Sequence, residues 1–286
     1  MIKWIHVSLS IFAVLLVLAA SPMSAQEGAS APVEYPTVAA LDAETIPPRD
    51  RVQLARELLG IGIIAPPPTA PPAYALGDRE TFHVTNSSED LAFEVDAVLR
   101  AVGDHIYLWV EADVQVDQGS LKALALAFDQ RIYDETRRLW GSEDIPGIDG
   151  DPRVYGLFVR NLGAGTAAYF VSEHTYPVEA VSTSNEHEMF FFNLDSLGTN
   201  IDAPSLTPTV AHEFQHMIRS NQDPNEFTWV DEGFSKFTEI YLGFGDDNLS
   251  TALSFLVTPE TQLNTWPEDT SRLPYYGAAM LFVTYF

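Results

Sequence analysis

The chain has 286 residues, no cysteine, and a formal net charge of -25 from 40 acidic against 15 basic residues. This charge disfavours nucleic acid and anionic lipid as partners, while 46% hydrophobic and 12% aromatic content excludes a disordered chain. Without cysteine, disulfides, thiol nucleophiles and thiolate metal sites are excluded, so His and carboxylates remain as the strong metal ligands.

Residues 1–25 have the features of a secretory signal peptide. Lys3 provides a positive charge, residues 11–20 form an apolar run, and Ser24-Ala25 offers a cleavage point. The alternative is an uncleaved membrane anchor, but polar residues shorten the apolar run below the about 20 residues that a spanning helix needs. We therefore expect a secreted, extracellular or cell-surface protein, without stable membrane insertion after cleavage.

Residues 26–76 are rich in proline. Nine of the chain's 19 prolines lie between Pro32 and Pro72, a composition that favours extended polyproline conformation over a packed core. Helical spacing predicts one short helix from Arg49 to Leu59. Two interpretations stay open: a linker on the surface, or a propeptide that covers an active site until it is removed.

Residues 77–286 are expected to form one α+β domain, because strands are followed by helices. The pattern predicts a mixed or antiparallel sheet lobe with the helix of a metal motif, and then a mainly helical lobe. Asp117 is expected to cap a helix that continues to about Trp140. Alternation and apolar runs predict strands at 80–84, 93–102, 104–116, 154–159, 167–171 and 189–194.

The sequence His-Glu-Phe-Gln-His runs from His212 to His216. Thr207 followed by Pro208 predicts a helix start, and the helix is expected to continue to about Ser220. Such a helix places the two histidines one turn apart on the same face, where both imidazoles can bind a single Zn²⁺.

Glu213 is adjacent to the first histidine but angled away from it. This position suits a carboxylate that deprotonates the attacking water. The motif also arises by chance in roughly one chain in a hundred of this composition. The alternative is a polar helix face with two solvated histidines, and a third ligand would count against it.

The third ligand is expected to be Glu232, on a second helix from about Thr228 to Leu242. Glu232 lies off the apolar stripe of that helix, so an antiparallel return can direct it at the two histidines. Two His and one Glu leave a fourth position open for water, as in catalytic zinc sites. Glu239 is a candidate to accept the spare N–H of a ligand histidine, or else an exposed acid on a solvated helix.

The motif, together with Trp-Val-Asp-Glu-Gly-Phe-Ser at 229–235, resembles the gluzincin metallopeptidases. Their pattern is HExxH followed by a glutamate in a W-x-x-E-G-[LF]-[SA] context. Within that clan the chain is most similar to the secreted bacterial peptidases like hyicolysin and, more loosely, immune inhibitor A. The resemblance covers about 208–243. It implies His212, His216 and Glu232 as zinc ligands and Glu213 as the catalytic base.

The sequence departs from two related groups of gluzincins, and these departures narrow the subfamily that it resembles. The G-x-M-x-N motif of aminopeptidase-N-like enzymes is absent, and Lys236 stands where thermolysin-like enzymes have Asp. We therefore expect a zinc-dependent endopeptidase that acts on proteins or peptides. The alternative is a catalytically inactive surface-binding or adhesion protein that retains the scaffold. The oligomeric state is left open.

Catalysis also needs a donor to the developing oxyanion and a surface that holds the substrate. Tyr276 is the preferred donor, although a buried core tyrosine is the alternative reading. The strand at 189–194 is expected to offer an exposed edge to an extended substrate. The other candidate donors are Tyr241, Tyr275, His174 and His187.

Two further stretches carry expectations. Asp144, Asp149 and Asp151 could form an oxygen-rich Ca²⁺ loop, but the EF-hand spacing is missing and a plain turn is favoured. Residues 275–286 form an apolar stretch without a polar tail, so we expect the chain to be a C-terminally truncated fragment.

Overall fold

The structure is a computed structural model that describes residues 37–38, 40, 50–245, 248–267 and 270–286. The chain divides into two units, Met1–Ile46 and Pro47–Phe286, and the fold below is that of the second. The expected signal peptide lies outside the described residues. Within the described residues, no helix is both long enough and apolar enough to cross a membrane.

Six strands form one mixed sheet in the order β1-β2-β3-β4-β6-β5. Strands β1, β2 and β3 are antiparallel, β3, β4 and β6 are parallel, and β5 runs antiparallel to β6. The strands are β1 (Arg79–Asn86), β2 (Leu91–Val102), β3 (Ile106–Glu111), β4 (Val154–Val159), β5 (Ala168–Phe170) and β6 (Met189–Asn193).

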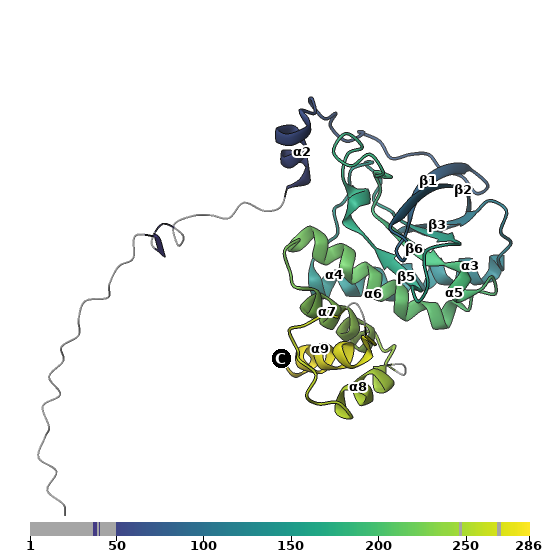
Figure 1. The fold of residues 1–286 in the computed structure, drawn as a ribbon. Helices are drawn as coiled ribbons and strands as arrows, with labels where there is room; N and C mark the ends of the chain where they lie inside the picture. The colour runs from purple at the N-terminus through teal and green to yellow at the C-terminus, as the bar shows by residue number, and fades with distance from the viewer. Residues whose placement is uncertain (1–36, 39, 41–49, 246–247, 268–269) are drawn as a thin grey trace, which may run out of the picture. The chain divides into compact units, whose positions relative to one another are not determined.

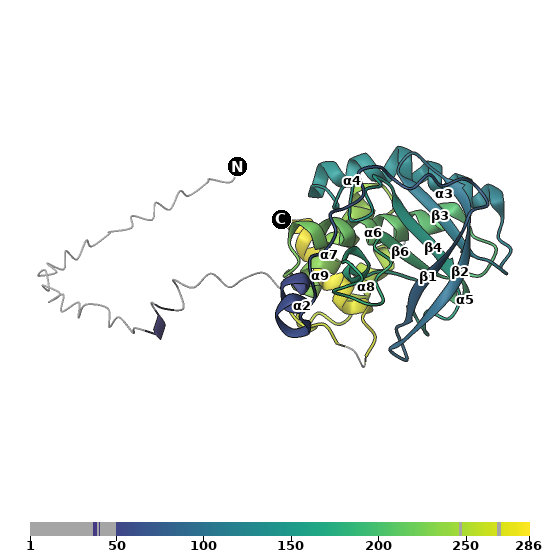
Figure 2. The same ribbon diagram turned by 90° about the horizontal axis from the view of Figure 1, so that it is seen from above.

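Helices follow and interrupt the strands, which confirms the α+β class. Figures 1 and 2 show α7, α8 and α9 gathered in one group, the expected helical lobe, and in Figure 1 α7 is the member of this group that lies beside α6. The helices are α2 (Arg51–Leu59), α3 (Gln118–Ala127), the π-helical η1 (Phe128–Ile132), α4 (Tyr133–Trp140), the 3-10 helix η2 (Ser172–Thr175), α5 (Leu194–Leu197), α6 (Ala203–Gln222), α7 (Thr228–Tyr241), α8 (Asn248–Leu256) and α9 (Leu273–Tyr285).

The sheet is covered on both faces, so every residue of β4 and β6 is buried. On one face, Phe128 of η1 and Phe214 of α6 pack in the same apolar cluster as Phe190. On the other face, Tyr74 packs against a second cluster that contains Trp109. The first cluster attaches α6, the helix of the metal motif, to the sheet.

The predicted start of the metal-motif helix is wrong. The helix α6 begins at Ala203, after the N-cap residue Asp202, and Pro208 lies inside it. Ala203 and Leu206 are both buried in the first apolar cluster, so their burial extends the helix by more than one turn before the proline. The Thr207 hydroxyl donates to the Ala203 carbonyl at 2.7 Å instead of capping the helix.

Two strand predictions are also corrected. The strand expected at 104–116 ends at Glu111, because Val114 N donates to Glu111 O at 3.0 Å and turns the chain towards α3. The strand expected to have an exposed edge, β6, lies between β4 and β5, and the edge strand is β5.

Candidate metal centre

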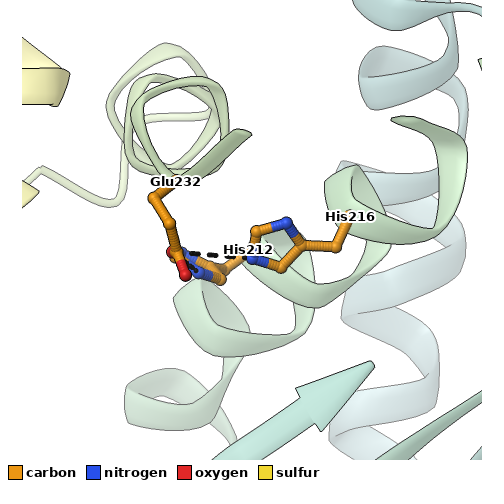
Figure 3. Close-up of side chains that lie close together, drawn as sticks. All are labelled: His212, His216 and Glu232. Atoms are coloured by element: carbon orange, nitrogen blue, oxygen red, sulfur yellow. Dashed lines mark hydrogen bonds and ion pairs between the residues drawn. The ribbon is translucent and has the colours of Figure 1, made fainter. Parts of the chain in front are cut away.

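His212, His216 and Glu232 form a cluster that could hold a metal ion. One ligand atom from each lies within 4.8 Å of the others. The two histidines come from α6 and the glutamate from α7, and their side chains meet between the two helices (Figure 3). Glu232 Oε2 lies 3.2 Å from His212 Nε2 and 3.6 Å from His216 Nε2. We call these three residues the His–Glu cluster.

The second nitrogen of each imidazole faces another carboxylate. His212 Nδ1 lies 2.8 Å from Glu239 Oε1, and His216 Nδ1 lies 3.0 Å from Asp231 Oδ1. The hydrogen bond with Glu239 holds the His212 ring and directs its Nε2 to the metal position. Asp231 Oδ1 makes no hydrogen bond, and the hydrogen-bond partner of His216 Nδ1 is Ser235 Oγ at 3.2 Å. Of the two readings left open for Glu239, the structure shows a buried acid in contact with His212 and not an exposed acid. Asp231 was missed, and its position directly before Glu232 was the only signal for it.

The two outer carboxylates have cationic partners of their own. Lys236 Nζ lies 2.9 Å from Glu239 Oε1, and Arg219 Nη2 lies 2.8 Å from Asp231 Oδ2. Burial raises the pKa of Glu239, but His212 and Lys236 lower it by a larger amount. The pKa of Glu239 is therefore below its usual value. Both outer carboxylates therefore remain charged beside the imidazoles.

The cluster favours positive charge at the imidazoles. Burial lowers the pKa of His212, but Glu232 and Glu239 more than offset this effect and raise the pKa to about 9. The pKa of His216 is likewise raised well above its usual value, by Asp231 and Glu232 against burial. A metal cation can supply this positive charge in place of the protons once the imidazoles are deprotonated.

Glu213 lies beside the cluster in a cleft of about 490 Å³, which Tyr276 also lines. Glu213 is 6% exposed, and burial raises the pKa of its carboxyl group. Burial also raises the pKa of Tyr276, together with the nearby Glu232 and Glu213 carboxylates. Tyr276 is therefore a neutral hydroxyl donor close to the cluster, with its ring centroid 6.3 Å from that of His212.

The other candidate donors do not line this cleft. Tyr241 accepts a hydrogen bond from Arg138, and the ring of Tyr275 packs against Trp266. His174 is buried elsewhere, and His187 lies between Asp149 and Glu80. Of the five candidates, the structure brings only Tyr276 to the cleft.

Strand β5 forms one wall of the cleft. The stretch from Gly165 to Phe170 lines it together with the His–Glu cluster. The other wall includes Lys236 and Arg272. The described part of the proline-rich segment, residues 50–76, contributes nothing to this lining. Its role as linker or propeptide stays a prediction.

Comparison with known proteins agrees with the motif. No family model matches the chain. The chain is 26% identical over 179 residues to the neutral metalloprotease ShpI of Staphylococcus hyicus. The sequence therefore has a metalloprotease relative. The match covers 57% of this chain and 40% of the relative, so the chain spans about two fifths of the relative's length.

The donor set fits zinc. Two imidazole nitrogens and one carboxylate oxygen are the ligands of many catalytic zinc sites, which keep one position open. The two Nε2 atoms converge on Glu232, while the two Nδ1 atoms lie on the other side of each ring, close to Glu239 and Asp231. His212, His216 and Glu232 would hold the ion.

Proposed function

We propose that the protein is an exported zinc-dependent endopeptidase of the gluzincin type. The observation that carries the proposal is the position of Glu213 in the same cleft as the His–Glu cluster. A free carboxylate beside three candidate ligands supplies a base that a structural metal site does not need. The metalloprotease relative supports the same assignment.

Zinc, when bound, would lower the pKa of water and polarise the scissile carbonyl. Glu213 takes the proton from the attacking water and returns it to the leaving amine. Burial raises the pKa of the Glu213 carboxyl group, which makes its carboxylate a stronger base than an exposed glutamate. Tyr276 donates a hydrogen bond to the developing oxyanion.

Strand β5 binds the substrate backbone. As the last strand of the sheet it has one unpaired edge, and it also lines the cleft. An extended peptide can add to such an edge through main-chain hydrogen bonds, which do not depend on the side chains. This mode suits an endopeptidase that acts on protein or peptide substrates.

The decisive variant is Glu213→Gln, which keeps the shape of the side chain but removes the base. We expect casein hydrolysis to fall by about 10³-fold, within the range for loss of a general base. Zinc content, measured by mass spectrometry of the metal, should remain about one per chain. The matched control is Glu260→Gln, because Glu260 is exposed and lies outside the cleft.

The alternative, a catalytically inactive surface-binding or adhesion protein, predicts the opposite result. If the wild type binds zinc but hydrolyses casein no faster than Glu213→Gln, the chain is an inactive scaffold with a surface-binding role. A wild type that binds no zinc at neutral pH would also overturn the proposal.

A further inference from the structure

Glu188 is a buried carboxylate whose two oxygens have no hydrogen-bond partner among the described residues. The residue is 2% exposed. Its position is held by the backbone, because Tyr155 N donates to Glu188 O at 2.8 Å. The loop backbone at Gly147 closes over the carboxylate, since a Cβ atom there would lie 2.0 Å from Glu188 Oε2. A buried, unpaired carboxylate is strongly unfavourable unless a cation accompanies it.

Glu188 is one of the residues that line a cavity of about 200 Å³, and the other polar lining residues offer oxygen atoms as ligands. Asn221 donates its amide nitrogen to Ser142 O at 3.0 Å, which leaves its amide oxygen as a ligand. Neither Lys, Arg nor His is among the described residues that line it. The lining residues are Asp144, Phe170, Thr175, Tyr176, Glu188, Met217, Ser220 and Asn221. We call this the acidic cavity.

Electrostatics also favours a cation there. Burial raises the pKa of Glu188 to about 8, with further contributions from the carboxylates of Asp149 and Asp144. Asp144 is exposed, and no described residue pairs with its side chain. Glu188 is therefore largely protonated near neutral pH when the acidic cavity is empty, and a cation bound beside it would release that proton.

The aspartates that the sequence suggested as further calcium ligands are engaged elsewhere. Asp149 Oδ2 accepts from the Tyr155 hydroxyl at 2.9 Å and lies 2.8 Å from His187 Nδ1. Asp151 accepts from the Tyr107 hydroxyl at 3.0 Å. These contacts show that Asp149 and Asp151 belong to a hydrogen-bond network and not to the acidic cavity.

We propose that the acidic cavity binds one Ca²⁺ ion, with Glu188 and Asp144 as its charged ligands. Calcium takes six to eight oxygen ligands in flexible geometry, and a lining with several oxygen ligands but no His or Cys disfavours zinc. The ion connects the loop at Asp144, the start of β6 and the end of α6, where Ser220 and Asn221 lie. It thereby holds the metal-motif helix against the sheet.

The test is calorimetric titration of the zinc-loaded full chain with calcium chloride, with the thermal midpoint Tm measured in parallel. We expect about one Ca²⁺ per chain and a Tm that rises with calcium concentration. Glu188→Gln should weaken calcium binding at least tenfold and Asp144→Asn severalfold. The surface variant Glu260→Gln should behave as the wild type.

The Tm measured without calcium provides a second test, because a purely structural role of Glu188 would not predict the same direction of change in the variant. At about pH 9, above the pKa of about 8, Glu188 carries an unpaired buried charge that Glu188→Gln removes, so at this pH the calcium-free Tm of the variant should be above that of the wild type. With saturating calcium the order should reverse. A wild-type Tm that does not respond to calcium would overturn the proposal, as would full calcium binding by Glu188→Gln. If Glu188→Gln does not fold, unchanged calcium affinity in Asp144→Asn would overturn it, because Asp144 is exposed.

Discussion

The His–Glu cluster and the acidic cavity differ in how their carboxylates are neutralised. In the cluster, Glu232 faces two imidazoles, and the surrounding acids have Lys236 and Arg219 as partners. In the cavity, the Glu188 carboxyl group has no hydrogen-bond partner among the described residues, and the lining includes a second acid, Asp144. The first site therefore contains the nitrogen donors that zinc accepts, and the second contains only the oxygen donors that calcium requires.

The difference teaches that net charge does not identify a metal site. Both sites lie in the same acidic chain, but the donor atoms and the available counter-charges determine which cation each one takes. The sites are also built differently along the chain. Two helices provide the cluster, whereas the cavity takes its ligands from separate loops, a strand start and a helix end.

The largest expected effect is on zinc affinity, and it distinguishes the His–Glu cluster from the acidic cavity. Glu232→Ala removes one of three zinc ligands, so zinc affinity should fall by at least about 10³-fold, while calcium affinity is unchanged. Glu188→Gln should show the reverse pattern. Parallel titrations with each metal measure both. Loss of both metals in either variant would mean that the sites are not independent.

Tyr276→Phe tests the chemistry of the cleft without removing a metal ligand. Loss of an oxyanion donor should lower kcat by about 10²-fold to 10³-fold, with KM nearly unchanged. Tyr275→Phe is the matched control, because the Tyr275 ring also contacts Trp266 but does not line the cleft. Steady-state kinetics on a fluorogenic peptide distinguishes the two. Equal kcat values for both variants would remove Tyr276 from the mechanism.

Asp231→Asn and Glu239→Gln address the orientation of the imidazoles. Each substitution keeps the shape of the side chain but weakens the interaction with one Nδ1 atom, so zinc affinity should fall 10-fold to 100-fold. Competition with a zinc-binding dye measures this change. Glu260→Gln serves as the surface control. A wild-type affinity in Asp231→Asn would show that the contact to His216 does not hold the ring.

The smallest expected effect concerns the loop over Glu188. Gly147 and Gly198 both have positive φ, 72° and 73°, so the backbone strain from alanine at either should cost about 1–3 kcal/mol of unfolding free energy. A Cβ at Gly147 also meets Glu188 Oε2, whereas nothing lies within 4 Å at Gly198. Gly147→Ala should therefore weaken calcium binding severalfold, and Gly198→Ala should not. Equal calcium affinity in both would place the ion away from Glu188.

Several elements followed from local pattern alone. The strand expected at 154–159 was observed with these bounds, and the helix expected from Thr228 ends within one residue of the expected position. Helical spacing also put His212 and His216 on one face. The strand prediction depends on a continuous apolar run, and the helix predictions depend on the period of 3.6 residues, both of which the sequence displays directly. The helix start at Ala203 was missed because tertiary burial of Leu206 outweighed the start signal at Pro208.

The sequence by itself determined which residues could hold zinc and which acid could act as base, because one helical turn separates His212 from His216 and Glu213 follows the first histidine. Only the tertiary structure decided that β5 and not β6 is the edge strand, that Asp231 faces His216, and that Glu188 is buried without a partner. The physical reason is that strand order and burial join residues far apart in the chain, and no local period records those contacts.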